Sequence, residues 1–328
     1  MASRTMNAVR YDTYGGGAAA LKHVEIPVPS PKKDEVLLKV EAASINPVDW
    51  KIQKGMIRPF LPPKFPFIPV TDVAGEILEV GAGVNSYKVG DKVVSMLGMR
   101  NGGGLAEYAV APASLTVHRP PEVFAAEAAG LPIAAVTAIL ALKTIETKFD
   151  GTGKAANVLV TAASGGVGLY AVQLAKLANH HVTATCGARN IELVKSLGAD
   201  EVLDYKTPEG ASLKSPSGRK YDLVVQCTVG IDWSTFEPNL SAKGKVIDLT
   251  PGLGTMVRSA WKKLTFSKQQ LVPFLVVVRN EDLKFLVELV KEGKLKTVVD
   301  SRHPLSKAEE AWAKSMDGHA TGKIIVEM

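Results

Sequence analysis

The sequence predicts an α/β protein in which a doubly wound parallel sheet is inserted after a partly closed β-barrel domain. Three observations predict this fold. Segments typical of β-strands dominate before residue 118, a glycine-rich strand-turn-helix pattern lies at 157–177, and strand-like and helical segments alternate after it. Strands that alternate with helices form parallel sheets. A chain of 328 residues is long enough for two such domains.

Short apolar segments separated by turn residues are typical of an antiparallel barrel. We predict strands at 6–11, 35–40, 72–81 and 105–110, and one more after the turn at Gly90-Asp91. Proline-rich loops lie at 27–31 and 59–69. Residues 122–142 are alanine-rich and helical, and we expect Pro132 to kink this helix where it bridges to the second domain.

The second domain begins with a candidate nucleotide-binding turn. A strand-like run at 157–160 leads into the turn Ala163-Ser164-Gly165-Gly166-Val167-Gly168, and residues 169–177 have helical spacing. Gly165 and Gly166 let the backbone approach a pyrophosphate, Gly168 lets the helix pack on the strand, and the helix N-terminus attracts the anion. Because Ala163 stands where the first glycine of the usual pattern would be, a plain structural turn is the alternative.

The alternation continues to about residue 292. Strand-like runs lie at 181–185, 201–205, 221–226, 245–249 and 271–278, and helical runs lie at 190–197, 233–240 and 281–291. The chain then returns to the first domain. We therefore assign residues 1–130 and 293–328 to the barrel domain and residues 131–292 to the dinucleotide-binding domain.

Composition and charge exclude several classes of protein. The net charge of +6 favours anionic partners, but basic residues are not clustered with interleaved aromatic residues, so nucleic acid is not expected as a partner. Two cysteines are too few for a disulfide framework. The longest uncharged run, 128–142, is too short to span a membrane. We also find no cleavable targeting segment before the first predicted strand.

Several motifs occur together in the order known from one family. They are Asn46-Pro47-Val48-Asp49-Trp50-Lys51, Asp72-Val73-Ala74-Gly75, Val89-Gly90-Asp91-Lys92-Val93, Ala163 to Gly168, Leu197-Gly198-Ala199-Asp200 and His319-Ala320-Thr321-Gly322-Lys323. On these motifs the chain resembles the zinc-independent quinone oxidoreductase branch of the medium-chain dehydrogenase/reductase superfamily over essentially its whole length. The resemblance implies a GroES-like substrate domain and a Rossmann-type sheet that binds NADPH. It also implies reduction of α,β-unsaturated carbonyls, such as lipid-derived enones and enals, or of quinones.

The resemblance further implies that no metal is bound. Zinc-dependent members carry Cys where Asn46 stands and Gly-His-Glu where Val70-Thr71-Asp72 stands, and they insert a four-Cys lobe between Gly90 and Leu105. A catalytic zinc needs three protein ligands and a structural zinc needs four. A conjugated acceptor delocalises the developing enolate charge, so hydride transfer to it does not require a Lewis acid.

The end of the second strand in the dinucleotide-binding domain favours NADPH over NADH. An NAD site usually places a carboxylate there to bind the ribose 2′-OH. Residues 185–191 contain no acid and instead offer Arg189, whose guanidinium can bind a 2′-phosphate through several donors. By resemblance, Tyr205 and Lys206 complete the phosphate site. The alternative for Arg189 is a solvated residue at a helix entry.

The resemblance places Asn46, Lys51 and Thr137 near the reacting groups. The Asn46 amide could donate a hydrogen bond to the developing oxyanion, or the residue could simply form a turn before Pro47. Lys51 is a candidate proton donor, although both it and Asp49 could be surface charges. Thr137 corresponds to a nicotinamide contact, but a Thr in an alanine-rich helix often serves packing.

Two further stretches bear on partners. Trp50, Phe60, Phe65 and Phe67 could form an apolar pocket for a lipophilic small-molecule acceptor, or could belong to the core. Residues 249–280 hold no acid but several basic residues, with Trp261 and Phe266, so they could contact anionic lipid or form a solvated face.

Location and function have alternatives as well. By resemblance to plant members of the branch at the chloroplast envelope, in 46–59 and 317–326, we expect a chloroplast location, peripheral at the inner envelope. Both a monomer and a homodimer are compatible with the sequence. The alternative function is that of a non-enzymatic NADPH-binding protein that senses redox state or acts at a membrane surface.

Overall fold

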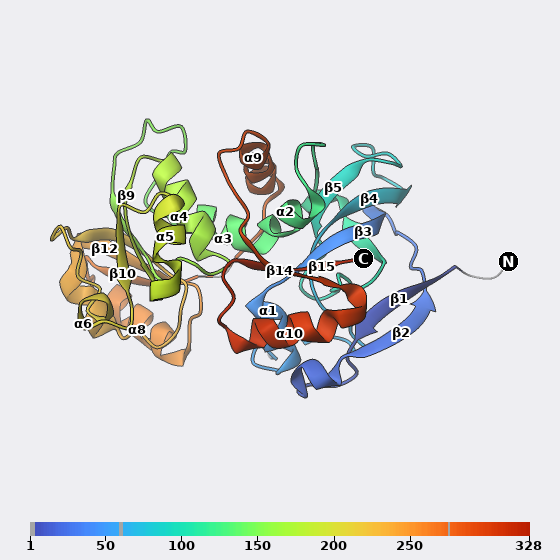
Figure 1. Cartoon of the computed structure of the whole chain (residues 1–328), viewed down its shortest axis with the longest axis horizontal. Helices are drawn as coiled ribbons and strands as arrows, with labels where there is room; N and C mark the ends of the chain where they lie inside the picture. The colour runs from blue at the N-terminus through green and yellow to red at the C-terminus, as the bar shows by residue number, and fades with distance from the viewer. Residues whose placement is uncertain (1–3, 59–61, 275) are drawn as a thin grey trace. The chain divides into compact units, whose positions relative to one another are not determined.

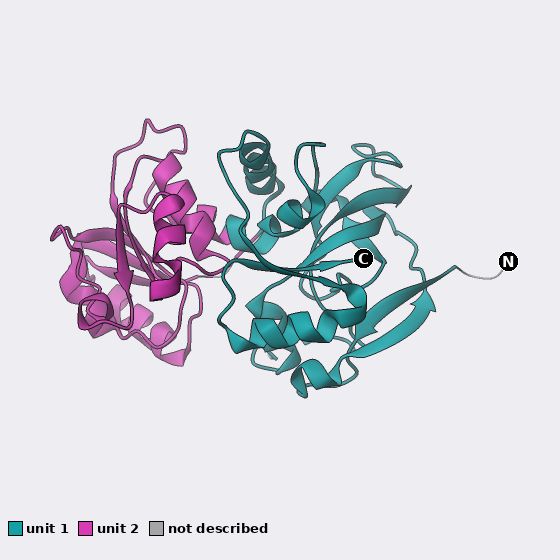
Figure 2. Ribbon diagram, viewed as in Figure 1, with its two compact units in different colours: residues 1–136, 278–328 teal, residues 137–277 magenta. Residues whose placement is uncertain are grey.

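The computed structural model describes residues 4–58, 62–274 and 276–328. The chain divides into two compact units, and Figure 2 shows them in different colours. Unit 1 comprises residues 1–136 and 278–328, and unit 2 comprises residues 137–277. Phe60, one of the four aromatic residues of the predicted pocket, lies outside the described residues.

Unit 1 is built around a mainly antiparallel sheet. Its strands are β3 (Glu35–Ile45), β4 (Asp72–Val80), β5 (Lys92–Met96), β6 (Tyr108–Pro112), β7 (Thr116–His118), β14 (Val299–Pro304) and β15 (Lys323–Glu327). The order is β14-β15-β3-β4-β5-β7, with β6 also paired to β3 and with β14 parallel to β15. β1 (Thr5–Arg10) and β2 (Lys22–Pro27) form a separate hairpin. The C-terminal β15, red in Figure 1, therefore lies beside the N-terminal β3, which is blue.

The helices of unit 1 are short. They are α1 (Pro47–Gln53), α2 (Ala125–Ala129), α9 (Asn280–Lys291) and α10 (Ala308–Asp317). A π-helical segment, η3 (Leu131–Ala135), joins α2 to α3 (Val136–Lys143). The helix predicted over 122–142 is thus interrupted where Pro132 lacks a backbone N–H and cannot continue the regular hydrogen-bond ladder.

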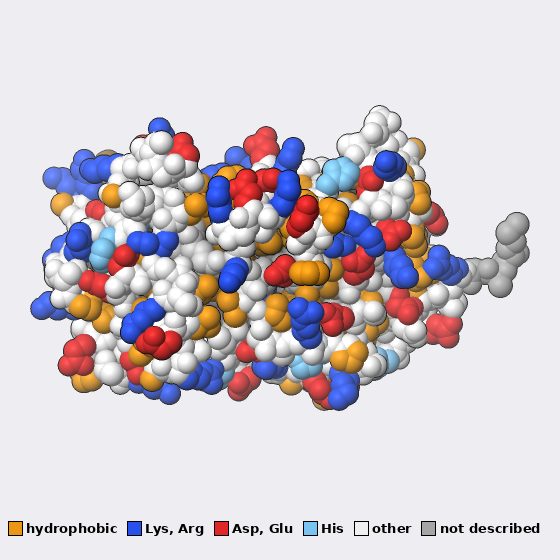
Figure 3. All heavy atoms as spheres, turned by 45° about the horizontal axis from the view of Figure 1, so that its top comes forward, with side chains coloured by type: hydrophobic (Ala, Val, Ile, Leu, Met, Phe, Trp, Pro, Cys, Tyr) orange, Lys and Arg blue, Asp and Glu red, His pale blue; other side chains and the backbone are white. Residues whose placement is uncertain are grey.

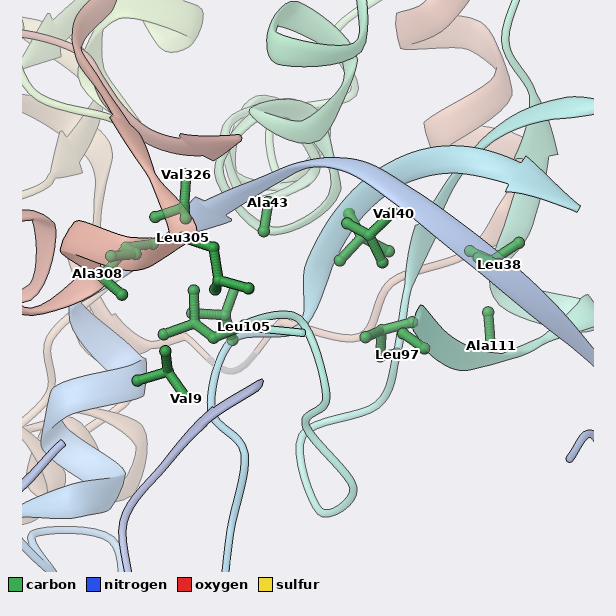
Figure 4. Packing of buried hydrophobic residues seen from close by; sticks show 14 of the residues in the cluster. Val9, Leu38, Val40, Ala43, Leu97, Leu105, Ala111, Leu305, Ala308 and Val326 are labelled. Carbon is green, nitrogen blue, oxygen red and sulfur yellow. The ribbon is translucent and has the colours of Figure 1, made fainter. Parts of the chain in front are cut away.

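The core of unit 1 lies between the sheet and α10. Leu38 and Val40 of β3 belong to this core cluster, while Leu37 and Ala42 of the same strand are buried as well. Trp312 of α10 is fully buried in the same cluster. Figure 4 shows Val9, Leu105 and residues of the C-terminal segment, among them Leu305, converging from distant parts of the sequence. This packing ties the C-terminal return to the barrel.

Unit 2 contains a parallel sheet in the doubly wound order. Its strands are β8 (Asn157–Val160), β9 (His181–Cys186), β10 (Glu201–Asp204), β11 (Tyr221–Gln226), β12 (Leu240–Asp248) and β13 (Gln270–Pro273). They are arranged β10-β9-β8-β11-β12-β13. Numbered from β8, this is the order 3-2-1-4-5-6 of dinucleotide-binding sheets. Ligands of such sheets bind beyond the carboxyl ends of the strands where the order reverses, which here is between β8 and β11.

The helices of unit 2 confirm part of the predicted pattern. They are α4 (Gly168–Leu177), α5 (Ile191–Ser196), α6 (Pro208–Ala211), α7 (Trp233–Phe236) and α8 (Leu253–Leu264). The helix predicted over 233–240 is wrong beyond Phe236, because a 3-10 turn follows and Leu240 already begins β12. The predicted late strand at 271–278 is shorter, as β13 ends at Pro273. No helix was predicted where α8 lies.

The C-terminal boundary between the units also differs from the sequence-based assignment. We assigned residues up to 292 to the dinucleotide-binding domain, whereas α9 packs in unit 1 against β7 and η3. Its buried side chains, which include Leu283, Leu286 and Val287, explain this placement. On the face of the molecule shown in Figure 3, acidic and basic side chains are interspersed. The net positive charge therefore does not form a continuous basic field on that face.

Candidate functional site

Asn46 lies at the N-terminus of α1 in a buried polar cluster of unit 1. Its backbone N–H donates to Asp49 Oδ2 at 2.7 Å, which is one half of a capping box. Pro47 occupies the first helical position, where a missing N–H costs nothing. The Asn-Pro pair therefore starts a helix, whereas the alternative interpretation predicted only a turn before Pro47.

The side-chain amide of Asn46 is bonded at both ends. Its Oδ1 accepts a hydrogen bond from Lys323 Nζ at 2.6 Å. Its Nδ2 donates to Asp72 Oδ2 at 2.9 Å and to the carbonyl oxygen of Ser44 at 3.3 Å. Since an amide nitrogen has two hydrogens, Asn46 in this conformation has none left for a substrate oxyanion.

Asp72, at the start of β4, receives three hydrogen bonds. Besides Asn46, its donors are the backbone N–H of Ile133 in η3 at 3.0 Å and the hydroxyl of Thr71 at 3.3 Å. The amide of Ile133 lies in the first turn of the π-helical segment, so the segment that interrupts the long helix also contributes a donor to the cluster.

Burial changes the protonation of this cluster. It raises the pKa of Asp72 to about 6, although Lys323 opposes the rise. It raises the pKa of Asp49 to about 8 despite the hydrogen bond from the backbone of Asn46, and the charge of Asp72 adds to the rise. It lowers the pKa of Lys323, against the attraction of Asp72 and Asp49. Neutral pH lies above the pKa of Asp72 and below that of Asp49, so the favoured state has Asp72 ionised and Asp49 protonated.

A second buried contact fixes α1 against the C-terminal helix. Gln53 Oε1 accepts a hydrogen bond from Trp312 Nε1 at 3.0 Å, and Gln53 Nε2 donates to the carbonyl oxygen of Gly17 at 2.9 Å. Asp49 and Gln53 thus anchor the same face of α1. The alternative in which Asp49 is a surface charge is wrong, because its side chain is buried.

The remaining candidates on and near α1 are less enclosed. Lys51 is half-buried, with its Nζ 5.8 Å from the centroid of the Trp50 ring. Phe67 is buried and stacks at a tilt on Tyr11, with ring centroids 5.6 Å apart, whereas Phe65 is partly exposed. Trp50 packs against the core cluster. Phe67 and Trp50 therefore contribute to packing within unit 1.

In unit 2, the turn between β8 and α4 has the geometry of a close backbone approach. Ala162 adopts a positive φ of 47°, and Ala163 donates its N–H to Thr185 in β9 at 2.8 Å. A Cβ on Gly168 would lie 2.4 Å from the carbonyl oxygen of Ala162. Gly168 is therefore required for the helix to pack on the turn, as predicted, while the position of Ala163 does not need a glycine.

The rest of the turn lies along the start of α4. Gly165 donates its N–H to Ala162, and the Ser164 hydroxyl accepts a hydrogen bond from Asn190 at 3.0 Å. No side chain caps α4 at Val167. The first N–H groups of a helix have no partner within it, and so Gly166 and Val167 present backbone where a phosphate could bind.

Arg189 follows the carboxyl end of β9, and Tyr205 and Lys206 follow the carboxyl end of β10. These strands are adjacent, with Asp204 opposite Cys186, and the N–H of Tyr205 donates to the carbonyl oxygen of Cys186 at 3.2 Å. All three side chains are exposed, and Lys206 Nζ is 5.9 Å from the centroid of the Tyr205 ring. We call Arg189, Tyr205 and Lys206 the basic edge.

Two other groups near the sheet complete the description of unit 2. Glu192, the nearest acid after β9, pairs with Lys195 at 2.9 Å on α5. Thr137 is buried in α3.

The two cysteines are free, with Cys186 buried at the end of β9 and Cys227 partly buried after β11. Burial raises the pKa of Cys186 to about 11 and that of Cys227 to about 12.

The sequence analysis assigned no role to Asp72 or Lys323. Both residues stood in the quoted motifs, yet their contacts with Asn46 bridge 26 and 277 positions of sequence. A signal existed, because Lys323 opens the apolar run Ile324-Ile325-Val326, where a charge is out of place unless it is paired.

The cluster does not fit a catalytic zinc. Among the described residues, no group of three or more His, Cys, Asp or Glu side chains is arranged to hold a metal ion. In the cluster itself, the Asn46 oxygen that could face a metal accepts from the ammonium group of Lys323. The donors that zinc needs are therefore replaced by a cation of the chain itself.

Two family models match the chain. The alcohol dehydrogenase GroES-like domain matches residues 32–121, and the zinc-binding dehydrogenase family matches residues 197–326. The first match covers much of the barrel, and the second runs from α5 to β15. The name of the second family mentions zinc, but the Asn46 cluster lacks the corresponding ligands.

Known proteins resemble the chain over its full length. It is 70% identical to the chloroplast envelope quinone oxidoreductase homolog of Arabidopsis thaliana over 328 residues, which is 100% of both chains. It is 33% identical to the chloroplastic NADPH-dependent alkenal/one oxidoreductase of the same plant, over 98% of this chain and 80% of that one. The quinone oxidoreductase structure from Coxiella burnetii superposes with a TM-score of 0.88 at 29% identity, covering 99% of this chain and 100% of the other.

Within residues 4–58, 62–274 and 276–328, no helix has both the length and the apolar character needed to cross a bilayer.

Proposed function

Because the chain belongs to the quinone oxidoreductases of the medium-chain dehydrogenase/reductase superfamily, we propose that it reduces α,β-unsaturated carbonyls or quinones with NADPH. The acceptor would be a lipophilic enone, enal or quinone. When bound, NADPH supplies the hydride. The relatives that support this acceptor class are named as quinone and alkenal/one oxidoreductases.

The main support for the proposal is the geometry at the carboxyl ends of β8, β9 and β10. The turn before α4 offers backbone N–H groups to a pyrophosphate, and Gly168 lets α4 pack closely on this turn. On the neighbouring strand ends, the basic edge offers a guanidinium, a phenol and an ammonium group. These are donors suited to a 2′-phosphate.

The choice of NADPH over NADH follows from the charges at this edge. A carboxylate after β9 would repel a 2′-phosphate, but the first acid after β9, Glu192, forms an ion pair with Lys195 on α5. Arg189 is exposed in the 3-10 turn that precedes α5. The name of the alkenal/one oxidoreductase also includes NADPH.

In unit 1 we assign Asn46 a positioning role. Its amide joins Lys323 to Asp72, and its backbone joins Asp49, so that it fixes the start of α1. Lys51, on the same helix and half-buried, stays our candidate for the proton donor. Its Nζ lies 5.8 Å from the centroid of the Trp50 ring, and removal of Lys51 would test the role.

We also place the protein in the chloroplast, peripheral at the envelope. Support comes from the relatives, since both Arabidopsis proteins are named as chloroplastic or as proteins of the chloroplast envelope. Fluorescent-protein fusion and fractionation of purified envelopes with and without an alkaline wash would test it. Recovery in the stroma alone would contradict the peripheral assignment.

The central experiment measures oxidation of NADPH and of NADH by the purified chain with a panel of enones, enals and quinones. Turnover with NADPH on at least one acceptor class supports the proposal. Arg189→Ala and Lys206→Ala should each raise KM for NADPH about 10- to 100-fold, as expected for lost charge-assisted hydrogen bonds, and leave KM for NADH unchanged.

Lys154→Ala is the matched control, because it removes an exposed basic residue that precedes the amino end of β8, at the opposite edge of the sheet. It should leave both KM values unchanged. If NADPH binds with the expected preference but no acceptor in the panel is reduced, the protein is instead a non-enzymatic NADPH-binding protein. Equal loss of NADPH and NADH binding in Arg189→Ala would contradict the assignment of the phosphate site.

A further inference from the structure

Helix α8 packs on unit 2 with its polar face toward the domain and its apolar face toward solvent. Its inward residues are polar, since Ser259 is buried and the Thr255 hydroxyl donates to Asp248 Oδ2 at 2.7 Å. Lys262 lies over the Trp233 ring at 3.8 Å from its centroid and pairs with Glu237. Helices on globular domains normally turn their apolar face inward.

The outward face of α8 is apolar. With 3.6 residues per turn, Leu253, Val257, Trp261 and Leu264 fall on one stripe, and their exposed fractions are 87%, 71%, 65% and 72%. Phe266, just beyond the helix, is 92% exposed. We call these five residues the apolar stripe. Single exposed apolar residues are common, but a contiguous set on one helix face marks a contact surface.

Basic side chains border this surface. On the helix, Arg258 and Lys263 fall on opposite flanks of the apolar stripe, and Lys268 follows Phe266; all three are exposed. The sequence holds no Asp or Glu between residues 249 and 280. A second copy docked through the same face would bring like charges together, which disfavours that partner. An anionic surface complements both the charge and the apolar character.

We propose that the apolar stripe of α8, with Arg258, Lys263 and Lys268, docks the protein on a membrane that contains anionic lipid. A helix with an apolar face flanked by basic residues lies in the interface plane, with the apolar side chains at the boundary between headgroups and acyl chains. The polar face of α8 stays on the domain, so docking requires no rearrangement of the sheet. This inference rests on the proposed peripheral location at the envelope, to which it adds the contact surface, and it does not depend on the proposed reductase activity.

Co-sedimentation with vesicles tests it, using phosphatidylcholine alone and phosphatidylcholine mixed with phosphatidylglycerol. We expect binding to the mixed vesicles at physiological ionic strength and little binding to neutral ones. Arg258→Glu with Lys263→Glu should weaken binding at least 25-fold, since each basic residue near the surface contributes about fivefold. Trp261→Ser with Leu264→Ser should abolish it.

Matched controls separate this surface from general charge and hydrophobicity. Lys154→Glu with Lys214→Glu changes the charge equally on exposed positions of unit 2, and Val89→Ser with Phe124→Ser removes exposed apolar residues elsewhere. Both controls should bind the mixed vesicles as the unmodified protein does, and all variants should retain its thermal unfolding midpoint. An α8 variant that unfolds is replaced by Val257→Ser alone, which removes one apolar contact.

Two results would overturn the proposal. One is absence of binding to the mixed vesicles, and the other is binding that the α8 variants do not change. Sedimentation velocity without lipid tests a further alternative, in which the apolar stripe is a subunit interface. If the unmodified chain is a dimer that Trp261→Ser with Leu264→Ser converts to a monomer, the stripe is a subunit interface and not a lipid-binding surface.

Discussion

The Asn46 cluster and the basic edge both gather charged side chains, but in opposite surroundings. Asn46, Asp72 and Lys323 are buried, and each is held by hydrogen bonds within the chain. Arg189 and Lys206 are exposed at strand ends. In a buried cluster, loss of one partner leaves the other without a hydrogen bond and without water around it. An exposed side chain that loses its partner is solvated instead. The cluster should therefore govern stability and the edge should govern ligand affinity.

The largest expected effect is that of Lys323→Met. It removes the donor to Asn46 Oδ1 and the cation that balances Asp72. We expect the free energy of unfolding to fall by about 3–5 kcal/mol, as for other broken buried pairs, measured by urea denaturation. The surface variant Lys307→Met removes a pair with Glu310 and should cost less than about 1 kcal/mol.

A second substitution makes that test specific. Adding Asp72→Asn to Lys323→Met removes the uncompensated carboxylate, so the double variant should be more stable than Lys323→Met alone. If the free energy of unfolding of the double variant falls by the sum of the two single losses, Lys323 and Asp72 do not form a coupled pair. The expected role of the Asn46 cluster in stability would then be wrong.

Gly168→Ala should have the next largest effect. Its new Cβ would lie 2.4 Å from the carbonyl oxygen of Ala162, so the turn must shift. We expect a loss of about 1–3 kcal/mol in stability, typical of overpacking, together with weaker NADPH binding by fluorescence titration. Gly254→Ala, in a helix where no atom lies within 4 Å of the new Cβ, should be neutral or stabilising.

The pH dependence of stability gives a smaller effect. Burial raises the pKa of Asp49 to about 8, so the unfolded chain releases this proton at a lower pH than the folded chain does. The stabilisation is fully present below the unfolded pKa near 4 and is lost as pH rises through 8. One such proton contributes a slope of at most about 1.4 kcal/mol per pH unit.

Urea denaturation between pH 5 and pH 8 would measure this slope. Asp49→Asn, which cannot ionise, should reduce the decline. The pKa of Asp12 is lowered, first by its hydrogen bond with Lys22, so Asp12→Asn should leave the slope in this range unchanged. An unchanged slope in Asp49→Asn would mean that Asp49 is ionised in the folded protein.

The smallest effect on folding should come from the basic edge. Arg189→Ala should change the free energy of unfolding by less than about 0.5 kcal/mol, as for other surface substitutions, even though its KM for NADPH rises. Thermal denaturation in the absence and presence of NADPH would show this. NADPH should raise the midpoint of the unmodified protein more than that of the variant. If Arg189→Ala were much less stable than the unmodified protein without ligand, the basic edge would contribute to stability as the Asn46 cluster does.

The parts of the fold that local pattern determines could be predicted. The runs at Val158–Val160 and Tyr221–Gln226 are apolar enough to be buried strands, and Gly168 was predicted to be a packing glycine for the reason that the structure gives. The parallel pairing of β9 and β10 also puts the segments that hold Arg189 and Tyr205 at the same edge of the sheet, because adjacent parallel strands end there.

What could not be predicted depends on contacts between distant residues. Nothing local to Lys323 reveals that it faces Asn46, since 277 positions separate them. Helix α8 was not predicted because the segment was interpreted from its charge and not from the helical spacing of its apolar residues. Its polar Thr255 and Ser259 face inward and its apolar residues face outward, so the usual expectation of an apolar inner face does not apply.

The two cysteines have a consequence for a protein that handles electrophiles. Enones and enals add to thiolates, and a thiol with a high pKa is rarely ionised. The pKa of Cys186 is raised to about 11 and that of Cys227 to about 12, so at neutral pH only a minute fraction of either is in the reactive form. We therefore expect both thiols to react slowly with the proposed acceptors at neutral pH.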